Sequence, residues 1–112
     1  MVISKGQMVQ IHALFNEAFA RKTMANLEAK YPEWAASQSL ESRNEMLTKG
    51  MKQAAKHQMQ SPKEVAIFLE YLVKFGEDLE DNPKHDWARK ILKVRNIGGF
   101  EKISRMQKKM PI

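Results

Sequence analysis

The sixteen residues from Ser61 to Gly76 are apolar on nearly every side, so the rest of the chain must fold around them. Ser61 is a typical N-cap, Pro62 suits the first helical turn, and Glu64 completes a capping box with Ser61. Apolar side chains then recur at helical spacing and cover most of the circumference: Val65, Ala66, Ile67, Phe68, Leu69, Tyr71, Leu72, Val73 and Phe75. Because burial of each large one stabilises the fold by roughly 1.5 to 3 kcal/mol, neither face can remain in water. We predict a central buried helix over about 62–75, ended by Gly76 in a left-handed conformation.

A long amphipathic pattern precedes this central helix. Ser4 and Gln7 form a weaker capping box, and apolar residues follow at helical spacing over 8–31. Pro32 disfavours a helical conformation in the residue before it, so we expect the first helix to end there. A short turn of helix is expected over 33–37.

The next helix begins at Ser37 or Ser39, since either residue can serve as its N-cap. Its predicted buried stripe consists of Leu40, Leu47, Met51, Ala54 and Ala55. Gly50 lies in the middle of this helix, where glycine costs up to about 1 kcal/mol relative to alanine. Its presence there indicates a close crossing with another helix.

Two shorter helices are expected after the central one. Pro83 opens the first of them, and its inward-facing residues are predicted to be Trp87, Ala88, Ile91 and Leu92. After Gly98 and Gly99, a terminal helix carries a weak apolar stripe formed by Phe100, Ile103, Met106 or Gln107, and Met110. No segment alternates in the manner of a strand. The patterns together predict an all-α fold, a compact single-domain bundle of four to six helices over residues 1–112.

Length and composition agree with one ordinary globular domain. The chain has 112 residues, of which 43% are apolar and 29% charged, and these values do not suggest disorder. Cysteine is absent, which excludes disulfides, a thiolate nucleophile and a cysteine-based zinc site. No segment approaches the ~20 apolar residues of a membrane span, and the N-terminus does not read as a secretory signal. We therefore expect a cytoplasmic protein that does not enter a membrane.

The positive charge of the chain is unevenly distributed. The formal net charge is +6, and the pI is near 9.7. Residues 1–60 carry +3, residues 61–86 carry −4 and residues 87–112 carry +7. An acidic middle followed by a basic end predicts a dipolar protein in place of a uniformly basic one.

Neither the acidic residues nor the histidines form a recognisable catalytic or metal-binding pattern. The acidic stretch contains Glu77, Asp78, Glu80, Asp81 and Asp86, but it lacks the ligand spacing and central glycine of a calcium loop. We interpret it as a solvated loop, with an acidic partner-binding edge as the alternative. The histidines, His12, His57 and His85, are widely spaced and are interpreted as ordinary surface or half-buried residues. We therefore predict no catalytic residues, no metal site and no cofactor.

The basic end leaves two interpretations open. Its cations are Arg89, Lys90, Lys93, Arg95, Lys102, Arg105, Lys108 and Lys109. Binding to single-stranded nucleic acid favours interleaved aromatic residues, yet Phe100 is the only aromatic residue after Trp87. A solvated face or a site for an acidic protein partner is therefore favoured over nucleic-acid binding. Met106 and Met110 lie on a tail with little else to bury, so we expect them to face a partner or a second copy of the chain.

Several core and capping positions also resemble a known group of proteins. They are Tyr31, Pro32, Gly50, Ser61, Glu64, Val65, Ala66, Phe68, Leu69, Phe75, Gly76, Asp78, Leu79, Asn82, Pro83, Trp87, Ala88, Ile91 and Leu92. Over residues 8–93 the chain resembles small, uncharacterised, all-helical bacterial proteins encoded in gene clusters with type VI secretion effectors, PAAR or VgrG spike proteins and effector adaptors. The resemblance implies a cytoplasmic co-adaptor or co-chaperone that contacts an effector or its adaptor. It brings no catalytic or ligand residues, and the segment from Arg95 onward departs from it.

The residues and the resemblance together predict a non-enzymatic protein-interaction module. An immunity protein that blocks a toxin and a small nucleic-acid-binding protein are the alternatives. The segment 95–112 is expected to vary with the partner. The predicted partner-binding residues are Glu77, Asp78, Glu80, Asp81, Lys93, Arg95, Arg105, Met106, Lys108, Lys109 and Met110.

Overall fold

The protein is all-helical over residues 17–112, which are the residues that the computed structural model describes. Its elements are α2 (Glu17–Lys30), α3 (Pro32–Ser37), α4 (Leu40–Lys56), α5 (Pro62–Phe75), the 3-10 turn η1 (Pro83–His85), α6 (Asp86–Leu92) and α7 (Gly99–Lys109). No strand occurs in that range, so the predicted all-α fold is confirmed. The predicted capping box at Ser4 and Gln7, the apolar positions before residue 17 and His12 lie outside the described residues.

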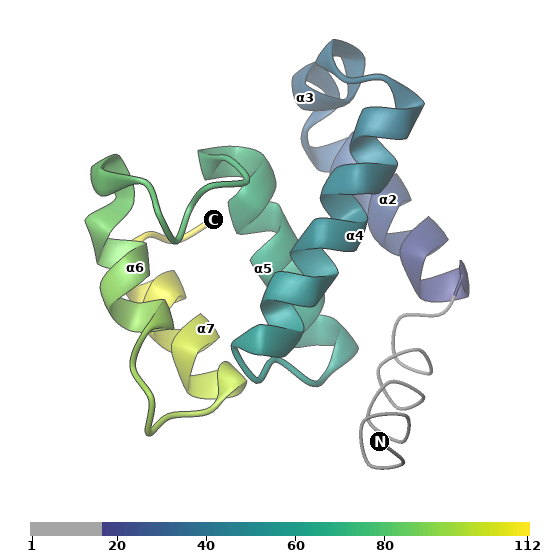
Figure 1. Ribbon diagram of the computed structural model, residues 1–112. Helices are drawn as coiled ribbons and strands as arrows, with labels where there is room; N and C mark the ends of the chain where they lie inside the picture. The colour runs from purple at the N-terminus through teal and green to yellow at the C-terminus, as the bar shows by residue number, and fades with distance from the viewer. Residues whose placement is uncertain (1–16) are drawn as a thin grey trace.

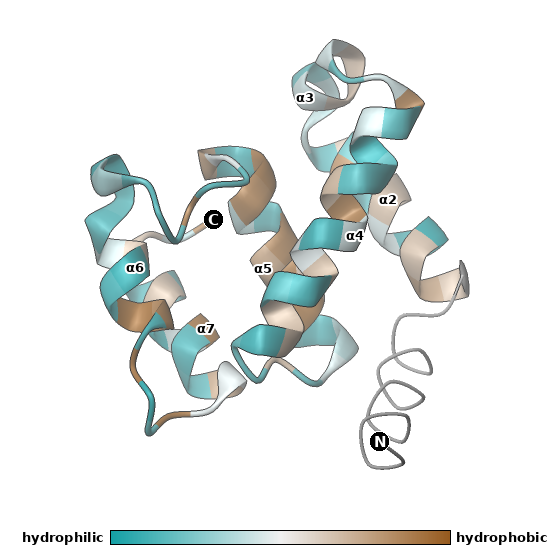
Figure 2. Ribbon diagram, in the orientation of Figure 1, coloured by the Kyte–Doolittle hydropathy of each residue, from teal (hydrophilic) through white to brown (hydrophobic). Residues whose placement is uncertain are grey.

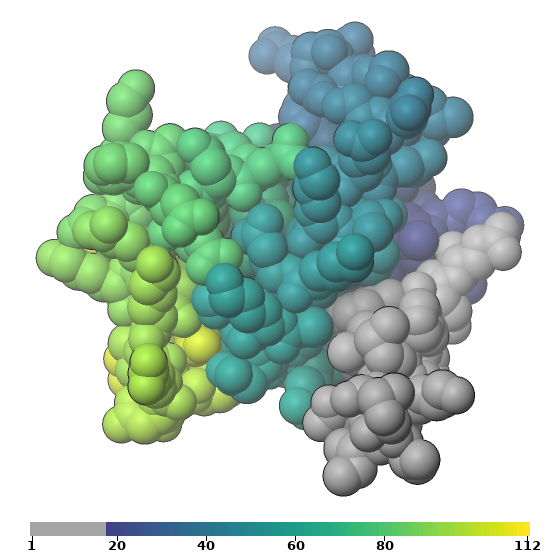
Figure 3. Space-filling view, viewed as in Figure 1, coloured from purple at the N-terminus to yellow at the C-terminus, as the bar shows by residue number. Residues whose placement is uncertain are grey.

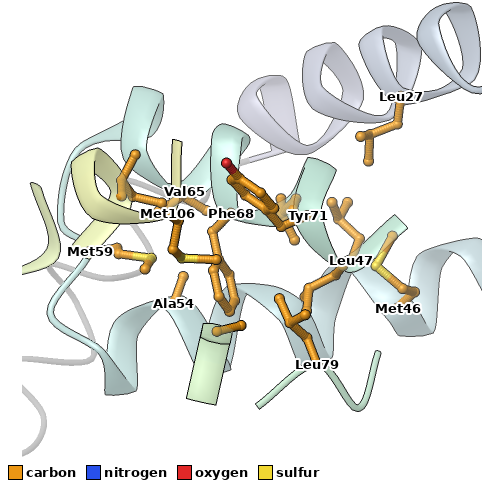
Figure 4. Packing of buried hydrophobic residues seen from close by; sticks show 14 of the residues in the cluster. Leu27, Met46, Leu47, Ala54, Met59, Val65, Phe68, Tyr71, Leu79 and Met106 are labelled. Atoms are coloured by element: carbon orange, nitrogen blue, oxygen red, sulfur yellow. The ribbon is translucent and has the colours of Figure 1, made fainter. Parts of the chain in front are cut away.

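Helix α5 lies in the middle of the fold, as predicted. Figure 1 shows it between α2 and α4 on one side and α6 and α7 on the other, and it contacts α2, α4 and α7 directly. Much of its ribbon has the brown colour of hydrophobic residues in Figure 2. The fully buried ones are Val65, Phe68, Leu69, Tyr71 and Leu72. They form one core with residues from the other elements, and Figure 4 shows Phe68 near Ala54 of α4 and Met106 of α7.

The predicted signals begin and end α5. The Ser61 hydroxyl accepts a hydrogen bond from the Glu64 amide at 3.1 Å and donates one to the Glu64 carboxylate at 2.9 Å. Gly76 ends the helix with φ at +110° and ψ at 154°. The expected left-handed conformation is therefore replaced by an extended one at positive φ, a region open essentially to glycine alone.

Helix α4 crosses α5 at Gly50, as predicted. A Cβ atom at this position would lie 2.9 Å from the Leu72 Cδ1 atom and would also clash with Leu69, so the helices approach closely there. The predicted stripe needs correction, because Leu40 is 63% exposed and Met46 is buried in its place, while Met51 and Ala55 are only half-buried. Figure 1 explains the difference, since the first turn of α4 lies beside α3 and beyond the crossing with α5.

Helices α6 and α7 pack against each other and close the far side of the core. In α6 the predicted inward face is confirmed, with Ala88 and Leu92 buried and Trp87 and Ile91 half-buried against the core. In α7 the buried residues are Gly99, Lys102, Ile103 and Met106.

The buried face of α7 differs from the predicted one. Phe100, which belongs to the predicted apolar stripe, is 73% exposed, and Lys102 is buried. The reason is that Gly99 packs directly on the backbone of residues 58 and 59, which sets the rotation of the helix. Met106 consequently has no exposed surface, so the prediction that it faces a partner is wrong.

Candidate functional site

A hollow of about 380 Å³ opens where four separate segments of the chain meet. They are the end of α4 with the turn after it, the connection that follows α5, the end of α6 with the loop after it, and α7. Figure 1 shows the end of α4 beside the start of α7, and in Figure 3 teal atoms meet yellow-green atoms in the same region of the view. The hollow is lined by Lys56, His57, Gln58, Glu80, Leu92, Lys93, Val94, Arg95 and Lys102.

A buried histidine and a buried carboxylate meet in one wall of the hollow. His57 is 5% exposed and Glu80 is 6% exposed, and the His57 Nε2 atom lies 3.2 Å from the Glu80 Oε2 atom. The Lys56 Nζ atom lies 3.6 Å from the same carboxylate oxygen. Leu79, which has no exposed surface, anchors the connection after α5 in the core and so brings Glu80 inward.

Burial and nearby cations keep the His57 ring neutral. Burial lowers the pKa of His57, and the charges of Lys102 and Lys56 lower it further, while Glu80 raises it. A carboxylate can only accept, so the neutral ring carries its proton on Nε2 and donates it to Glu80. The pair therefore brings one negative charge into the wall of the hollow.

Lys102 is the least expected residue of this site. It is 3% exposed, and its Nζ atom donates a hydrogen bond to the Gln58 Oε1 atom at 3.1 Å. Gln58 itself has φ at +63°, which non-glycine residues adopt uncommonly. Burial lowers the pKa of Lys102, and the negative charge of Glu80 opposes that shift. Lysine is almost never fully buried unless it is paired, so this position requires an explanation.

Some of the predicted partner-binding residues come together at the hollow. Lys93 and Arg95 line it, and the Lys93 Nζ atom lies 4.0 Å from the Asp81 Oδ1 atom. Glu80 also lines the hollow, and its burial corrects the interpretation of the whole acidic stretch as a solvated loop. The solvated interpretation fits Glu77, Asp78 and Asp81, which are exposed.

The remaining predicted residues lie away from the hollow. Arg105 pairs with Glu101 one turn earlier on α7, at 3.0 Å. Lys108, Lys109 and Met110 are exposed at the end of α7, and the Met110 carbonyl accepts a hydrogen bond from the Tyr71 hydroxyl at 2.8 Å.

Six residues of the hollow were missed as site residues from the sequence: Lys56, His57, Gln58, Leu92, Val94 and Lys102. One signal could have identified Lys102. It stands three residues after Gly99 and four before Met106, so a stripe read from Gly99 in place of Phe100 includes it. No comparable local signal marks Gln58, whose role depends on contact with α7.

The neutral state of His57 makes stability depend on pH. The unfolded chain takes up a proton at this residue near pH 6.5, whereas the folded chain does so only at lower pH. More protons are therefore bound to the unfolded state in that window, and the free energy of unfolding should fall as pH drops below about 6.5. Urea unfolding at several pH values between 8 and 5 measures this change in the free energy of unfolding.

His57→Gln should remove part of that pH dependence, while His85→Gln should retain it and serves as the control. The slope contributed by one such residue cannot exceed about 1.4 kcal/mol per pH unit. An unchanged slope in His57→Gln would show that other groups cause the acid sensitivity.

Comparisons of the chain with protein-family models, with curated proteins and with solved structures give no match. Within residues 17–112, no group of three or more acidic or histidine side chains could hold a metal ion. None of the described helices combines the length and apolar character needed to cross a bilayer. The basis that the structure offers for assigning a function is therefore the hollow and its charged surroundings.

Proposed function

We propose that the protein is a non-enzymatic protein-interaction module, a cytoplasmic co-adaptor or co-chaperone for a type VI secretion effector or its adaptor. The resemblance over residues 8–93 suggests this class. The observation that carries the proposal is the convergence of the acidic connection and the basic C-terminal region at one hollow, which Glu80, Lys93 and Arg95 line together. The Lys93 Nζ atom also lies 4.0 Å from the Oδ1 atom of Asp81, a residue outside the lining.

The charges around the hollow favour a partner that presents an acidic segment. Its lining contains four cationic side chains and one carboxylate, so an excess of positive charge faces the opening. Lys56, Lys93 and Arg95 are exposed, and they can meet carboxylates of a partner without any movement of the core. Complementary charges of this kind set the association rate and the orientation of a complex more than its affinity.

A pull-down with the products of neighbouring genes tests the proposal. We expect capture of an effector or adaptor at low salt, with weaker capture at high salt because exposed charges are screened. The double variant Lys93→Glu with Arg95→Glu should weaken binding about tenfold, which corresponds to about 1.4 kcal/mol. The matched control reverses two exposed lysines on other helices, Lys22→Glu with Lys63→Glu, and should bind like the wild type.

Other outcomes would assign a different role. Absence of capture at every ionic strength would contradict the proposal. Protection of cells that express a neighbouring toxin would identify an immunity protein. Retention on DNA or RNA with a steep loss of affinity as salt rises would assign the basic residues to phosphate contacts.

A further inference from the structure

The position of Lys102 is unfavourable for a protein that binds nothing in the hollow. The residue is almost entirely buried, yet the single hydrogen bond that its ammonium group makes among residues 17–112 goes to the neutral amide of Gln58. An ammonium group has three N–H donors, so two remain for another acceptor. Burial of a charge is costly unless the charge is paired and hydrogen-bonded.

The nearby carboxylates do not form a contact ion pair with Lys102. The Oε2 atom of Glu80 accepts from His57 and lies 3.6 Å from the Lys56 ammonium. Asp81 is exposed and lies near Lys93. Each of these carboxylates thus lies near an exposed lysine, Glu80 near Lys56 and Asp81 near Lys93.

A second cation of the hollow is also unpaired. Arg95 lines the hollow and is exposed, and it makes no ion pair or side-chain hydrogen bond to any residue in the described part of the chain. Lys102 and Arg95 therefore offer to one space two positive charges that form no contact ion pair, the first from a buried position and the second from an exposed one. Only the more distant charge of Glu80 opposes that of Lys102.

We propose that the hollow binds a small molecule through a dianionic phosphoryl group, with Lys102 and Arg95 as its main protein ligands. A guanidinium can hold two phosphoryl oxygens side by side, and an ammonium acts as a compact point charge. A dianion matches two cations that form no contact ion pair, whereas a single carboxylate would make such a pair with only one of them. The volume of about 380 Å³ lies at the lower end of the range for ligand pockets, which admits a phosphoryl group with a small substituent.

Phosphate binding does not require the protein partner proposed above, although Arg95 belongs to both proposals, because the isolated chain should bind the ligand. We expect inorganic phosphate and glycerol phosphate, added at constant ionic strength, to cause saturable shifts of the Lys102 and Arg95 side-chain NMR signals. Both ligands should also raise the melting temperature, since a ligand that binds only the folded state stabilises it. Malonate, a dicarboxylate of the same charge, should bind at least tenfold more weakly.

Two variants assign the binding to this hollow. Lys102→Met should weaken phosphate binding at least tenfold while the ligand-free protein melts at the same or a higher temperature, because the cost of burying an ammonium group without a contact ion pair is removed. Arg95→Gln alters only an exposed residue, so it should fold normally and weaken binding several-fold. Lys63→Met, on the exposed side of α5, should bind phosphate like the wild type.

Three results would overturn the assignment. They are the absence of saturable shifts at tens of millimolar phosphate, equal binding by wild type and Lys102→Met, and equal affinity for malonate and phosphate. The partner pull-down contains no added phosphate, so either proposal can fail without deciding the other.

Discussion

Gly99→Ala is expected to lower the free energy of unfolding by about 3 kcal/mol or more, an effect at the upper end of those caused by overpacking. A Cβ atom at this position would lie 2.6 Å from the Met59 Cα atom and 2.7 Å from the Gln58 carbonyl carbon. Both are backbone atoms, so no side chain can rotate to relieve the contact. Helix α7 would have to move away from the turn after α4, which would also separate Lys102 from Gln58.

Two other glycines provide matched controls for this experiment. Nothing lies within 4 Å of a Cβ atom at Gly98, so Gly98→Ala should change stability little. At Gly50 the atoms in the way are the side-chain ends of Leu69 and Leu72, which can shift. Alanine also gains up to about 1 kcal/mol over glycine within a helix, so Gly50→Ala should cost less than Gly99→Ala.

Urea unfolding of the three glycine variants measures these differences. Equal losses at positions 98 and 99 would show that the close packing of α7 on the turn after α4 does not contribute to stability. A loss at Gly50 as large as that at Gly99 would show that Leu69 and Leu72 cannot rearrange.

Helix α5 could be predicted because all the information for it is local. Ser61, Pro62 and Gly76 mark its ends, and its apolar surface leaves no face that could remain in water. The crossing at Gly50 could be predicted for a similar reason, since a glycine within a helix needs a packing cause.

The rotation of α7 could not be predicted, because two stripes compete in its sequence. One runs from Phe100 through Ile103 to Gln107 and Met110, and the other from Gly99 through Lys102, Ile103 and Met106. Hydrophobicity favours the first stripe. The second is selected by the contact of Gly99 with the backbone of residues 58 and 59, which is separated from it by about forty residues of chain.

The burial of Glu80 was missed for a related reason. Its neighbours are acidic, and such a composition is typical of a solvated connection. Leu79 is the single apolar side chain between Gly76 and Pro83, and its burial in the core turns Glu80 toward His57. The candidate site thus depends on tertiary contacts of Leu79 and Gly99, which a local reading of composition does not capture.

Glu80→Ala is expected to lower the free energy of unfolding by about 3 kcal/mol, because removal of one member of a buried charged group leaves the others uncompensated. The carboxylate accepts a hydrogen bond from His57 and opposes the charge of the buried Lys102. Without the Glu80 carboxylate, no buried negative charge in the hollow would oppose the positive charge of Lys102. Asp81→Ala is the matched control, since this carboxylate is 77% exposed and its loss should cost at most about 1 kcal/mol.

A double-mutant cycle separates the two contributions of Glu80. In a Lys102→Met background no buried ammonium remains, so Glu80→Ala should cost only about 1 kcal/mol, the value of the hydrogen bond with His57. The difference of about 2 kcal/mol from the single variant is the coupling between the two buried charges. If Glu80→Ala cost the same in both backgrounds, Glu80 would act through His57 alone, and the positive charge of Lys102 would already be compensated by water in the hollow.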